Sequence, residues 1–329
     1  MKIFTYTKAE TPQDAIRDAA ASSGARYIGG GTNLIDLMKE LVERPEHLTD
    51  VSQLKTTTIE KSQSGGVIIG GAVKNSDLAN HELIRTQYPV LSRALLSGAS
   101  PQLRNMATTA GNIMQRTRCY YFYDINSKCN KREPGTGCDA IEGYNRMNAV
   151  LGGSKHCIAL HPSDMAVAMA CLDAIVHTIS DSGERQIPLN EFYKLPGETP
   201  HIETVLKEHE LITAVELSPA PTNKHWCYLK VRDRASYEFA LVSAAVTLDM
   251  VAGKISRAKL ALGGVGTKPW RAFNSEKMLS GKAPDEHIFR AVAEDVMKPA
   301  VGYEHNQFKI ELAKRTIVRA LKVASGGVA

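Results

Sequence analysis

Four cysteines and a run of three glycines are the patterns in this 329-residue chain that could do chemistry. The cysteines are Cys119, Cys129, Cys138 and Cys157, with nine, eight and eighteen residues between successive members. Four thiolates can hold an iron–sulfur cluster. Structural zinc sites usually contain close cysteine pairs, which this spacing lacks, and an oxidising compartment would favour two disulfides. Because spacings this wide are weakly diagnostic, a cluster, zinc, disulfides and unrelated buried thiols all stay open from the residues alone.

The glycine run lies in the segment Ile28-Gly29-Gly30-Gly31-Thr32-Asn33-Leu34. Consecutive glycines let the backbone approach a ligand closely, and their N–H groups can form a nest for an anion such as a pyrophosphate. Thr32 and Asn33 add side-chain donors, and either is a suitable N-cap for a following helix. A tight strand-to-helix turn is the competing interpretation. The segment is not G-x-G-x-x-G, which disfavours a Rossmann fold.

A second loop, Ala107-Thr108-Thr109-Ala110-Gly111-Asn112, has the same character. Its small residues allow close approach, and its hydroxyls and amide supply hydrogen bonds. Alone it would be interpreted as a turn. Together the two loops predict the halves of a dinucleotide clamp.

Regular elements must position these loops. A strand over 25–28 is expected to enter the glycine run, and apolar residues at helical spacing over 34–41 indicate the helix that leaves it. A second unit begins near residue 58, with a strand over 67–72, a helix over 76–88, a helix over 91–96 and a polar run over 102–112. The first unit therefore spans 1–57 and the second 58–220.

The cysteines lie in an insertion over 115–160 that is aromatic and shows little periodicity. A long irregular stretch inside a compact domain needs a reason, and metal ligation supplies one. After it, Pro162 is expected in the first turn of an apolar helix that runs to Ala174. Strand-like alternation over 174–179 follows.

A linker is expected at Pro219-Ala220-Pro221-Thr222-Asn223. Beyond it, strands over 226–231, 239–250 and 255–262 and helices over 285–296 and 306–323 indicate a separate α+β domain, residues 224–329.

Five further residues have two interpretations each. Cys171 and Cys227 are expected in the core rather than as ligands. His161 is expected as a helix cap, with metal ligation as the alternative. Asp164 suits the positive end of a helix, and can also accept a hydrogen bond from a cofactor. Lys230 either belongs to a charged strand edge or reaches a cofactor.

Composition excludes some classes of function. The net charge is +5, and the basic residues occur in short groups rather than a stripe, so no nucleic-acid partner is expected. No segment is long and apolar enough to span a membrane. The N-terminal residues carry neither an apolar signal region nor twin arginines, so we expect no export address on this chain.

Several motifs resemble a known family. They are Gly29-Gly30-Gly31-Thr32-Asn33-Leu34, Arg104-Asn105-x-Ala107-Thr108-x-Ala110-Gly111-Asn112 and Ser163-Asp164-Met165-Ala166. Together with the Gly263-Gly264-Val265 and Pro269-Trp270-Arg271 stretches, they look like the FAD-binding subunit of the molybdenum hydroxylases. This is the medium-subunit family of xanthine dehydrogenase and carbon monoxide dehydrogenase. The resemblance covers nearly the whole chain.

Most members of that family lack the cysteine segment. The form that has it resembles the flavin subunit of 4-hydroxybenzoyl-CoA reductase and, more closely, the FAD and [4Fe–4S] subunit of bacterial periplasmic aldehyde oxidoreductase. The residues that carry the closer likeness are Gln115-Arg116-Thr117-Arg118-Cys119, Cys129-Asn130-Lys131-Arg132 and His161-Pro162-Ser163-Asp164-Met165-Ala166.

The resemblance implies an α+β fold. A PCMH/VAO-type FAD-binding domain of two subdomains, 1–57 and 58–220 with the iron–sulfur insertion 115–160, would precede a CO-dehydrogenase-flavoprotein-like C-terminal domain. It also implies an αβγ heterotrimer, in which a large subunit holds the molybdenum cofactor and a small subunit holds two [2Fe–2S] clusters. This chain would take electrons onto FAD and pass them to an external acceptor. It would have no catalytic residues of its own for aldehyde oxidation.

The resemblance also assigns site residues. The FAD contacts would be Tyr27, Ile28, Gly29, Gly30, Gly31, Thr32, Asn33, Leu34, Thr108, Gly111, Asn112, Ser163, Asp164 and Lys230. The [4Fe–4S] ligands would be Cys119, Cys129, Cys138 and Cys157. A periplasmic location, reached together with a signal-bearing partner, is implied in the same way, with the cytoplasm as the alternative. A 4-hydroxybenzoyl-CoA-reductase-type flavin subunit and a cofactor-free disulfide or zinc scaffold are the alternative functions.

Overall fold

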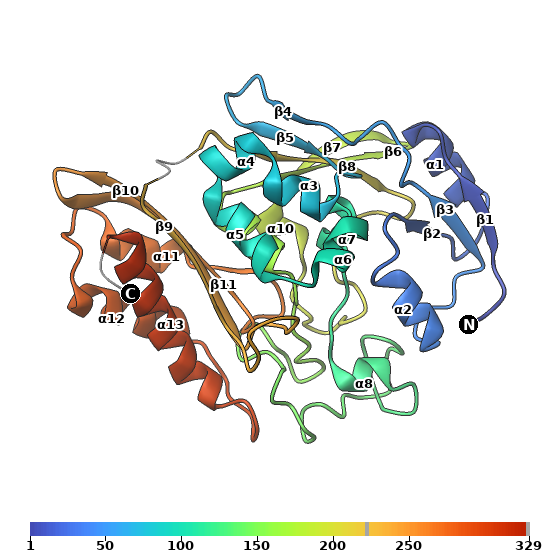
Figure 1. The fold of residues 1–329 in the computed structure, drawn as a ribbon. Coiled ribbons are helices and arrows are strands. Elements are labelled where there is room, and N and C mark those ends of the chain that lie inside the picture. Colours follow the sequence, from blue (N-terminus) through green and yellow to red (C-terminus); the bar gives the residue numbers. More distant parts are fainter. Residues whose placement is uncertain (221–223, 327–329) are drawn as a thin grey trace.

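The computed structural model describes residues 1–220 and 224–326, so positions 221–223 of the expected linker lie outside the described residues. Figure 1 shows sheets and helices following one another along the chain, with the last two long helices at one side of the molecule. The strands form a three-stranded, a five-stranded and a four-stranded sheet. Across the described part of the chain, no helix combines the length and apolar character needed to cross a bilayer.

The first sheet is parallel and positions the glycine run. Its elements are β1 (Thr5–Lys8), α1 (Pro12–Ala20), β2 (Arg26–Ile28), α2 (Leu34–Lys39) and β3 (His47–Asp50). The strand order is β1-β3-β2, and both outer strands pair with β3 in parallel. Parallel neighbours need crossover connections, which α1 and α2 supply. The glycine run is the connection between β2 and α2.

The second sheet is antiparallel and has the order β4-β5-β8-β6-β7. Its strands are β4 (Ile59–Lys61), β5 (Val67–Gly70), β6 (Ile175–Ser180), β7 (Gly183–Pro188) and β8 (Leu211–Leu217). The helices of this unit are α3 (Asn75–Asn80), α4 (Glu82–Gln87), α5 (Pro89–Ser97), α6 (Pro101–Met106), α7 (Thr109–Ile113), α8 (Tyr120–Tyr123), α9 (Asp164–Cys171) and α10 (Leu189–Phe192). Buried side chains of strands and helices, such as Val67 and Leu91, meet in one core.

Three details of this unit differ from the expectations. The helix expected over 76–88 is two helices, because His81 between them is extended, with φ −62° and ψ 135°. The polar run over 102–112 is helical, as α6 and α7. Pro162 lies before the N-cap of α9 rather than in its first turn, because Ser163 is the N-cap and its Oγ accepts from the Ala166 N–H at 2.9 Å.

The cysteine segment is almost free of regular structure. Between α7 and α9 its one helix among the described residues is the four-residue α8. Isolated antiparallel bridges join Cys129 to Cys138 and Ser154 to Cys157.

The C-terminal sheet is antiparallel, with the order β12-β11-β10-β9. Its strands are β9 (Trp226–Val231), β10 (Val242–Val251), β11 (Lys254–Gly263) and β12 (Trp270–Arg271), followed by α11 (Phe273–Glu276), the 3-10 turn η1 (Lys277–Leu279), α12 (Glu286–Met297) and α13 (Phe308–Ala324). In Figure 1, α12 and α13 lie on one side of this sheet and α5 on the other. Helix α13 contacts β9 and β10, whereas α9 contacts β10 and β11.

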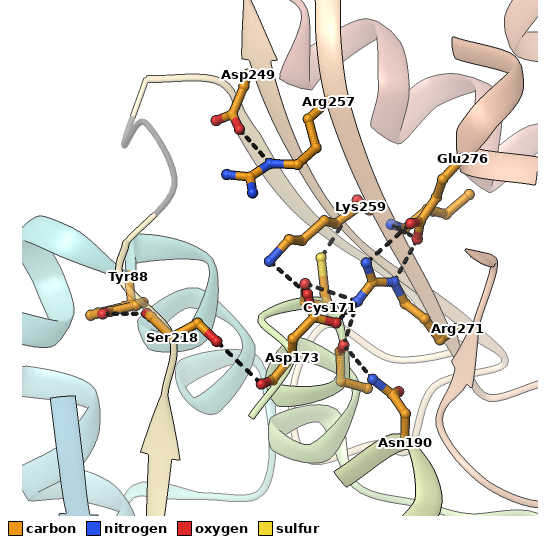
Figure 2. Close-up of polar contacts among 12 residues, drawn as sticks. Tyr88, Cys171, Asp173, Asn190, Ser218, Asp249, Arg257, Lys259, Arg271 and Glu276 are labelled. Carbon is orange, nitrogen blue, oxygen red and sulfur yellow. Dashed lines mark hydrogen bonds and ion pairs between the residues drawn. The ribbon is translucent and has the colours of Figure 1, made fainter. Parts of the chain in front are cut away.

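Helix α9 is buried along its length, and the C-terminal domain binds its carboxyl end. Arg271 donates to the carbonyl of Ala170 at 2.8 Å and pairs with Asp173 at 2.5 Å and Glu276 at 2.5 Å. Figure 2 shows Lys259 reaching the same Asp173, at 2.7 Å. A cation at the last carbonyls of a helix also complements its dipole.

Candidate functional site

The glycine run lies against the end of α6. A Cβ on Gly30 would stand 1.9 Å from the carbonyl oxygen of Met106, so only glycine fits there. A Cβ on Gly29 would stand 2.8 Å from Oγ1 of Thr108. Gly31 has φ +71°, a left-handed conformation that glycine adopts readily. The structure therefore brings together the two loops that were expected to form a clamp.

Hydrogen bonds fix the second loop and connect it to α9. Thr108 caps α7, and its Oγ1 accepts from the Gly111 N–H at 3.1 Å. Ser163 Oγ donates to Oδ1 of Asn112 at 2.6 Å. Asn33, an expected N-cap, does not cap α2 with its side chain; its Oδ1 accepts instead from the Arg116 N–H at 2.8 Å. The side chain of Asn33 thus joins the glycine run to the start of the cysteine segment.

Two cavities meet at these loops. The first cavity has a volume of about 440 Å³ and the second about 420 Å³. Both are lined by Thr32, Asn33, Gly111 and Gln115. A single elongated ligand that lies across the loops can therefore occupy both. A dinucleotide has this form, with a pyrophosphate in the middle and a ring system at each end.

The predicted cofactor contacts divide between the cavities. Those lining the first cavity are Tyr27, Ile28, Gly29, Gly30, Gly31, Thr32, Asn33, Leu34, Thr108 and Gly111. Those lining the second cavity are Thr32, Asn33, Gly111, Asn112, Asp164 and Lys230. Ser163 lines neither of the two and is buried, and it reaches the second cavity only through its hydrogen bond to Asn112. The phenol of Tyr27 donates to the carbonyl of His209 at 2.7 Å, and burial raises its pKa.

Asp164 is the centre of a buried polar group in the second cavity. Its Oδ2 pairs with Nζ of Lys230 at 2.7 Å, and its Oδ1 accepts from the phenol of Tyr228 at 2.5 Å. Lys230 also donates to the carbonyl of Ser97 at 3.1 Å. Burial, and then the charge of Asp164, raise the pKa of Tyr228 well above its usual value. Asp164 begins α9 whereas Tyr228 and Lys230 lie on β9, so both domains build this cavity.

The four predicted metal ligands lie in one packed cluster with Leu37, Phe122 and Ile158. All are free thiols, as are the buried Cys171 and Cys227, so the described residues 1–220 and 224–326 contain no disulfide. Cys157 also lines the first cavity. Within the described residues, no group of three or more His, Cys, Asp or Glu side chains is placed to hold a metal ion. The four cysteines therefore pack in one cluster, but their sulfur atoms do not point toward a common metal position.

The surroundings of the sulfurs are those of buried, hydrogen-bonded thiols. Asn148 Nδ2 donates to Sγ of Cys119 at 3.4 Å, and the Ala159 N–H donates to Sγ of Cys157 at 3.4 Å. Burial raises the pKa of the Cys119, Cys138 and Cys157 thiols, and the neighbouring thiols add to each shift. Thiolates here would need a compensating cation such as a metal centre.

His161 makes only a long hydrogen bond near the start of α9, and among the described residues it belongs to no group of side chains placed to hold a metal ion. Its Nδ1 accepts from the Ser163 N–H at 3.5 Å, and its Nε2 has no hydrogen-bond partner among the residues that the structure describes. Burial lowers its pKa to about 4, so the ring is neutral near pH 7.

Several residues of the site had no interpretation from the sequence. Tyr228 is one, and the charged side chains Glu43, Arg116, Lys131 and Glu203 in the wall of the first cavity are the others. Arg116 and Lys131 lie within segments that carry the family likeness, and that was the available signal. Their partners Glu43 and Glu203 are distant in the chain and carry no local pattern.

Comparisons with known proteins match nearly the whole chain. Residues 2–220 match the model of the FAD binding domain in molybdopterin dehydrogenase, and residues 227–328 match the CO dehydrogenase flavoprotein C-terminal domain. The chain is 53% identical over 325 residues to the aldehyde oxidoreductase FAD-binding subunit PaoB of Escherichia coli, covering 98% of this chain and 99% of that protein.

More distant relatives share the fold. The carbon monoxide dehydrogenase medium chain of Afipia carboxidovorans is 24% identical, over 98% of this chain and 96% of that protein. A solved structure of carbon monoxide dehydrogenase from Hydrogenophaga pseudoflava superposes with a TM-score of 0.77 at 22% identity, covering 99% of each chain. A solved structure of quinoline 2-oxidoreductase from Pseudomonas putida 86 gives 0.76 at 24% identity, again over 99% of each chain.

Proposed function

Because this chain belongs to the family of FAD-binding medium subunits of the molybdenum hydroxylases, we propose that it is the flavin subunit of an aldehyde oxidoreductase. The identity of 53% to a subunit with that name, over nearly the whole of both chains, supports this substrate class. In the proposal, partner subunits hold the molybdenum cofactor and two [2Fe–2S] clusters. Electrons arrive on this chain and leave to an external acceptor.

The observation that carries the proposal is the pair of cavities meeting at the glycine run. Gly30 leaves no room for a Cβ, so the backbone N–H groups of the run can approach a pyrophosphate directly. We propose that the fourteen residues named above, from Tyr27 to Lys230, bind FAD. The subdomain boundaries at 57/58 and 220/224 are proposed with it. FAD, when bound, supplies the capacity to accept and release electrons.

We propose that the redox-active ring lies in the first cavity and the nucleotide base in the second. Cys157 lines the first cavity, so electrons exchanged between the ring and the cysteine cluster would have a short path. The second cavity offers the pair Asp164 and Lys230, which suits hydrogen bonding to a nucleoside. Residues of this chain then bind, orient and shield the cofactor, and aldehyde oxidation belongs to the partner.

A [4Fe–4S] cluster held by Cys119, Cys129, Cys138 and Cys157 is part of the proposal. Four free thiols in one packed cluster, with N–H donors to two of the sulfurs, fit the donor chemistry of such a centre. The segment would converge around the metal on binding, because metal binding and folding are coupled. The free thiols also argue against the disulfide alternative, and the FAD-binding family argues against a cofactor-free scaffold.

The test is the absorption spectrum of the purified protein before and after anaerobic dithionite. We expect a flavin band over a broad iron–sulfur absorption, both lost on reduction. Cys119→Ser should lose iron and acid-labile sulfide, whereas Cys171→Ser, a buried cysteine outside the cluster, should keep both. A flavin band without iron in the unsubstituted protein would contradict the cluster and leave the flavin assignment standing.

The proposed partners, substrate and location can be tested only on the intact assembly. We expect a large and a small subunit to co-purify with this chain, and the complex to oxidise aldehydes. Reduction of aromatic thioesters instead would contradict the aldehyde proposal in favour of a 4-hydroxybenzoyl-CoA-reductase type. We also propose a periplasmic location, reached together with a signal-bearing partner. Recovery of the complex only in the cytoplasmic fraction would overturn that.

A further inference from the structure

Four charged side chains form one connected network in the wall of the first cavity. Arg116 pairs with Glu43 through one nitrogen and with Oε2 of Glu203 through Nε, at 2.6 Å. Lys131 Nζ pairs with the other oxygen of Glu203 at 2.8 Å and donates to the carbonyl of Pro200 at 2.9 Å. All four side chains line the first cavity. We call this group the charged wall.

The charged wall also contacts the cysteine cluster. The guanidinium carbon of Arg116 lies 4.5 Å from the ring centre of Phe122, which packs in that cluster. Lys131 follows Cys129 by two residues. Lys131 and Cys157 both line the first cavity, so the ammonium group and that cysteine border the same space. The cavity and the cysteine cluster therefore lie on two sides of the same charges.

Charges in this position act strongly, because little solvent screens them. The side chain of Lys131 is 10% exposed and that of Glu203 is 28% exposed. Burial raises the pKa of Glu203, but Arg116 and Lys131 outweigh that effect and lower it, so the carboxylate is ionised. Each one-electron reduction adds negative charge. A nearby cation stabilises the reduced form and a nearby anion destabilises it.

We propose that Lys131 and Glu203 are positioning residues that set the reduction potentials of the centres on both sides of the charged wall, in opposite directions. Lys131 raises the potentials and Glu203 lowers them. This inference rests on the proposed function, since it takes FAD to occupy the first cavity and a cluster to be held by the four cysteines.

The test is a spectroelectrochemical titration of the flavin and the cluster in the intact purified complex. With Lys131→Met, at fixed applied potential, we expect the ratio of reduced to oxidised cluster to fall about tenfold, a shift of about 59 mV for one electron. Glu203→Gln should shift the ratio the other way. Lys131→Arg keeps the charge and should leave it within twofold of the unsubstituted complex.

Lys128→Met is the matched control. Lys128 precedes Cys129 by one residue and is exposed, so removing its charge should change the ratio less than twofold. Shifts of the same sign for Lys131→Met and Glu203→Gln, or no shift in either, would overturn the inference. If the charged wall had only a structural role, the two substitutions would not shift the reduction potentials in opposite directions. Flavin, iron and sulfide contents measured on the same samples report separately on the proposed function. If iron is absent from the unsubstituted complex, the flavin titration alone tests the inference. Lys131→Met should then lower the reduction potential of the flavin, and Glu203→Gln should raise it.

Discussion

Lys230 Nζ lies 2.7 Å from Oδ2 of Asp164, and the two side chains are only 4% and 9% exposed. One belongs to the C-terminal sheet and the other to the helix that begins beside the clamp loops. The pair therefore makes the second cavity depend on contact between the two domains.

Replacing Lys230 by Met should destabilise the protein by about 3 kcal/mol, because it leaves a buried carboxylate without its cation. Removing both charges, in Lys230→Met with Asp164→Asn, should recover much of that loss. The control is Arg234→Met, which breaks a pair whose arginine is 63% exposed and should cost less than about 1 kcal/mol. Urea unfolding of the FAD-free proteins measures all three, and equal costs for Lys230→Met and Arg234→Met would contradict the argument.

Gly30→Ala should abolish or weaken FAD binding at least tenfold. The new methyl group would collide with the carbonyl of Met106, so one of the two clamp loops must move. Overpacking of this kind costs about 1–3 kcal/mol. Equilibrium binding of FAD to the apoprotein, followed by flavin fluorescence, is the measurement.

Gly183→Ala separates loss of stability from loss of binding. Gly183 is the first residue of β7, and it has φ +107° and open space around it. Its substitution strains the backbone but leaves the clamp intact, so FAD affinity should stay unchanged. Equal loss of FAD affinity in Gly30→Ala and Gly183→Ala would show that FAD binding does not depend on the close approach of the backbone at Gly30.

Arg271→Met should destabilise the protein by about 3–5 kcal/mol, because Asp173, Glu276 and the carbonyl of Ala170 lose a buried partner. FAD affinity should fall as well, since α9 carries Asp164 at its other end. Figure 2 shows a matched control, Arg257, which pairs with Asp249 at 2.7 Å but is 62% exposed. Arg257→Met should change the free energy of unfolding by less than about 1 kcal/mol and leave FAD affinity alone.

Lys309 should make the stability of the protein depend on pH, and comparison with Lys309→Met isolates its contribution. Its Nζ is fully buried and donates to the carbonyl of Asn148 at 2.9 Å. Burial, and then the charge of Arg146, lower its pKa to about 7 from an ordinary 10.5. Between those two values the unfolded chain binds more protons than the folded protein, so stability rises with pH.

Below about pH 7 the lysine is charged in both states, and the cost of burying the charge is present in full. We therefore expect the unsubstituted protein to gain stability relative to Lys309→Met between pH 7 and 10, by on the order of 3–5 kcal/mol. Urea midpoints of both proteins across that range measure the difference. A constant difference would mean that Lys309 keeps its ordinary pKa.

Local patterns predicted that two loops distant in the sequence come together. The glycine run and the segment over 107–112 are short motifs, and the structure brings them together. Asn33 is the N-cap residue of α2 as expected, but its side-chain oxygen accepts from the Arg116 N–H instead of capping the helix. The break at His81 has no glycine or proline to mark it, and the small polar residues over 102–112 hid two short helices.

Pairings between distant residues could not be predicted. Asp164 and Lys230 were each expected to contact a cofactor. The sequence around neither residue indicated that the two side chains form an ion pair with one another. Arg116 and Lys131 belong to segments that carry the family likeness, but their ion-pair partners could not be predicted, because Glu43 and Glu203 come from segments far away in the chain. Burial creates these charge networks, and burial is a property of the fold rather than of any short motif.

The attachment of α9 at both ends has a consequence for the order in which the protein matures. Helix α9 leaves the ribosome well before Lys230 and Arg271 are synthesised. Until those residues arrive, Asp164 and the carbonyl of Ala170 lack the partners that hold them. Contacts between residues so distant in sequence form late in folding. We therefore expect a chain that ends before residue 230 to lack a complete second cavity, and with it the proposed FAD site.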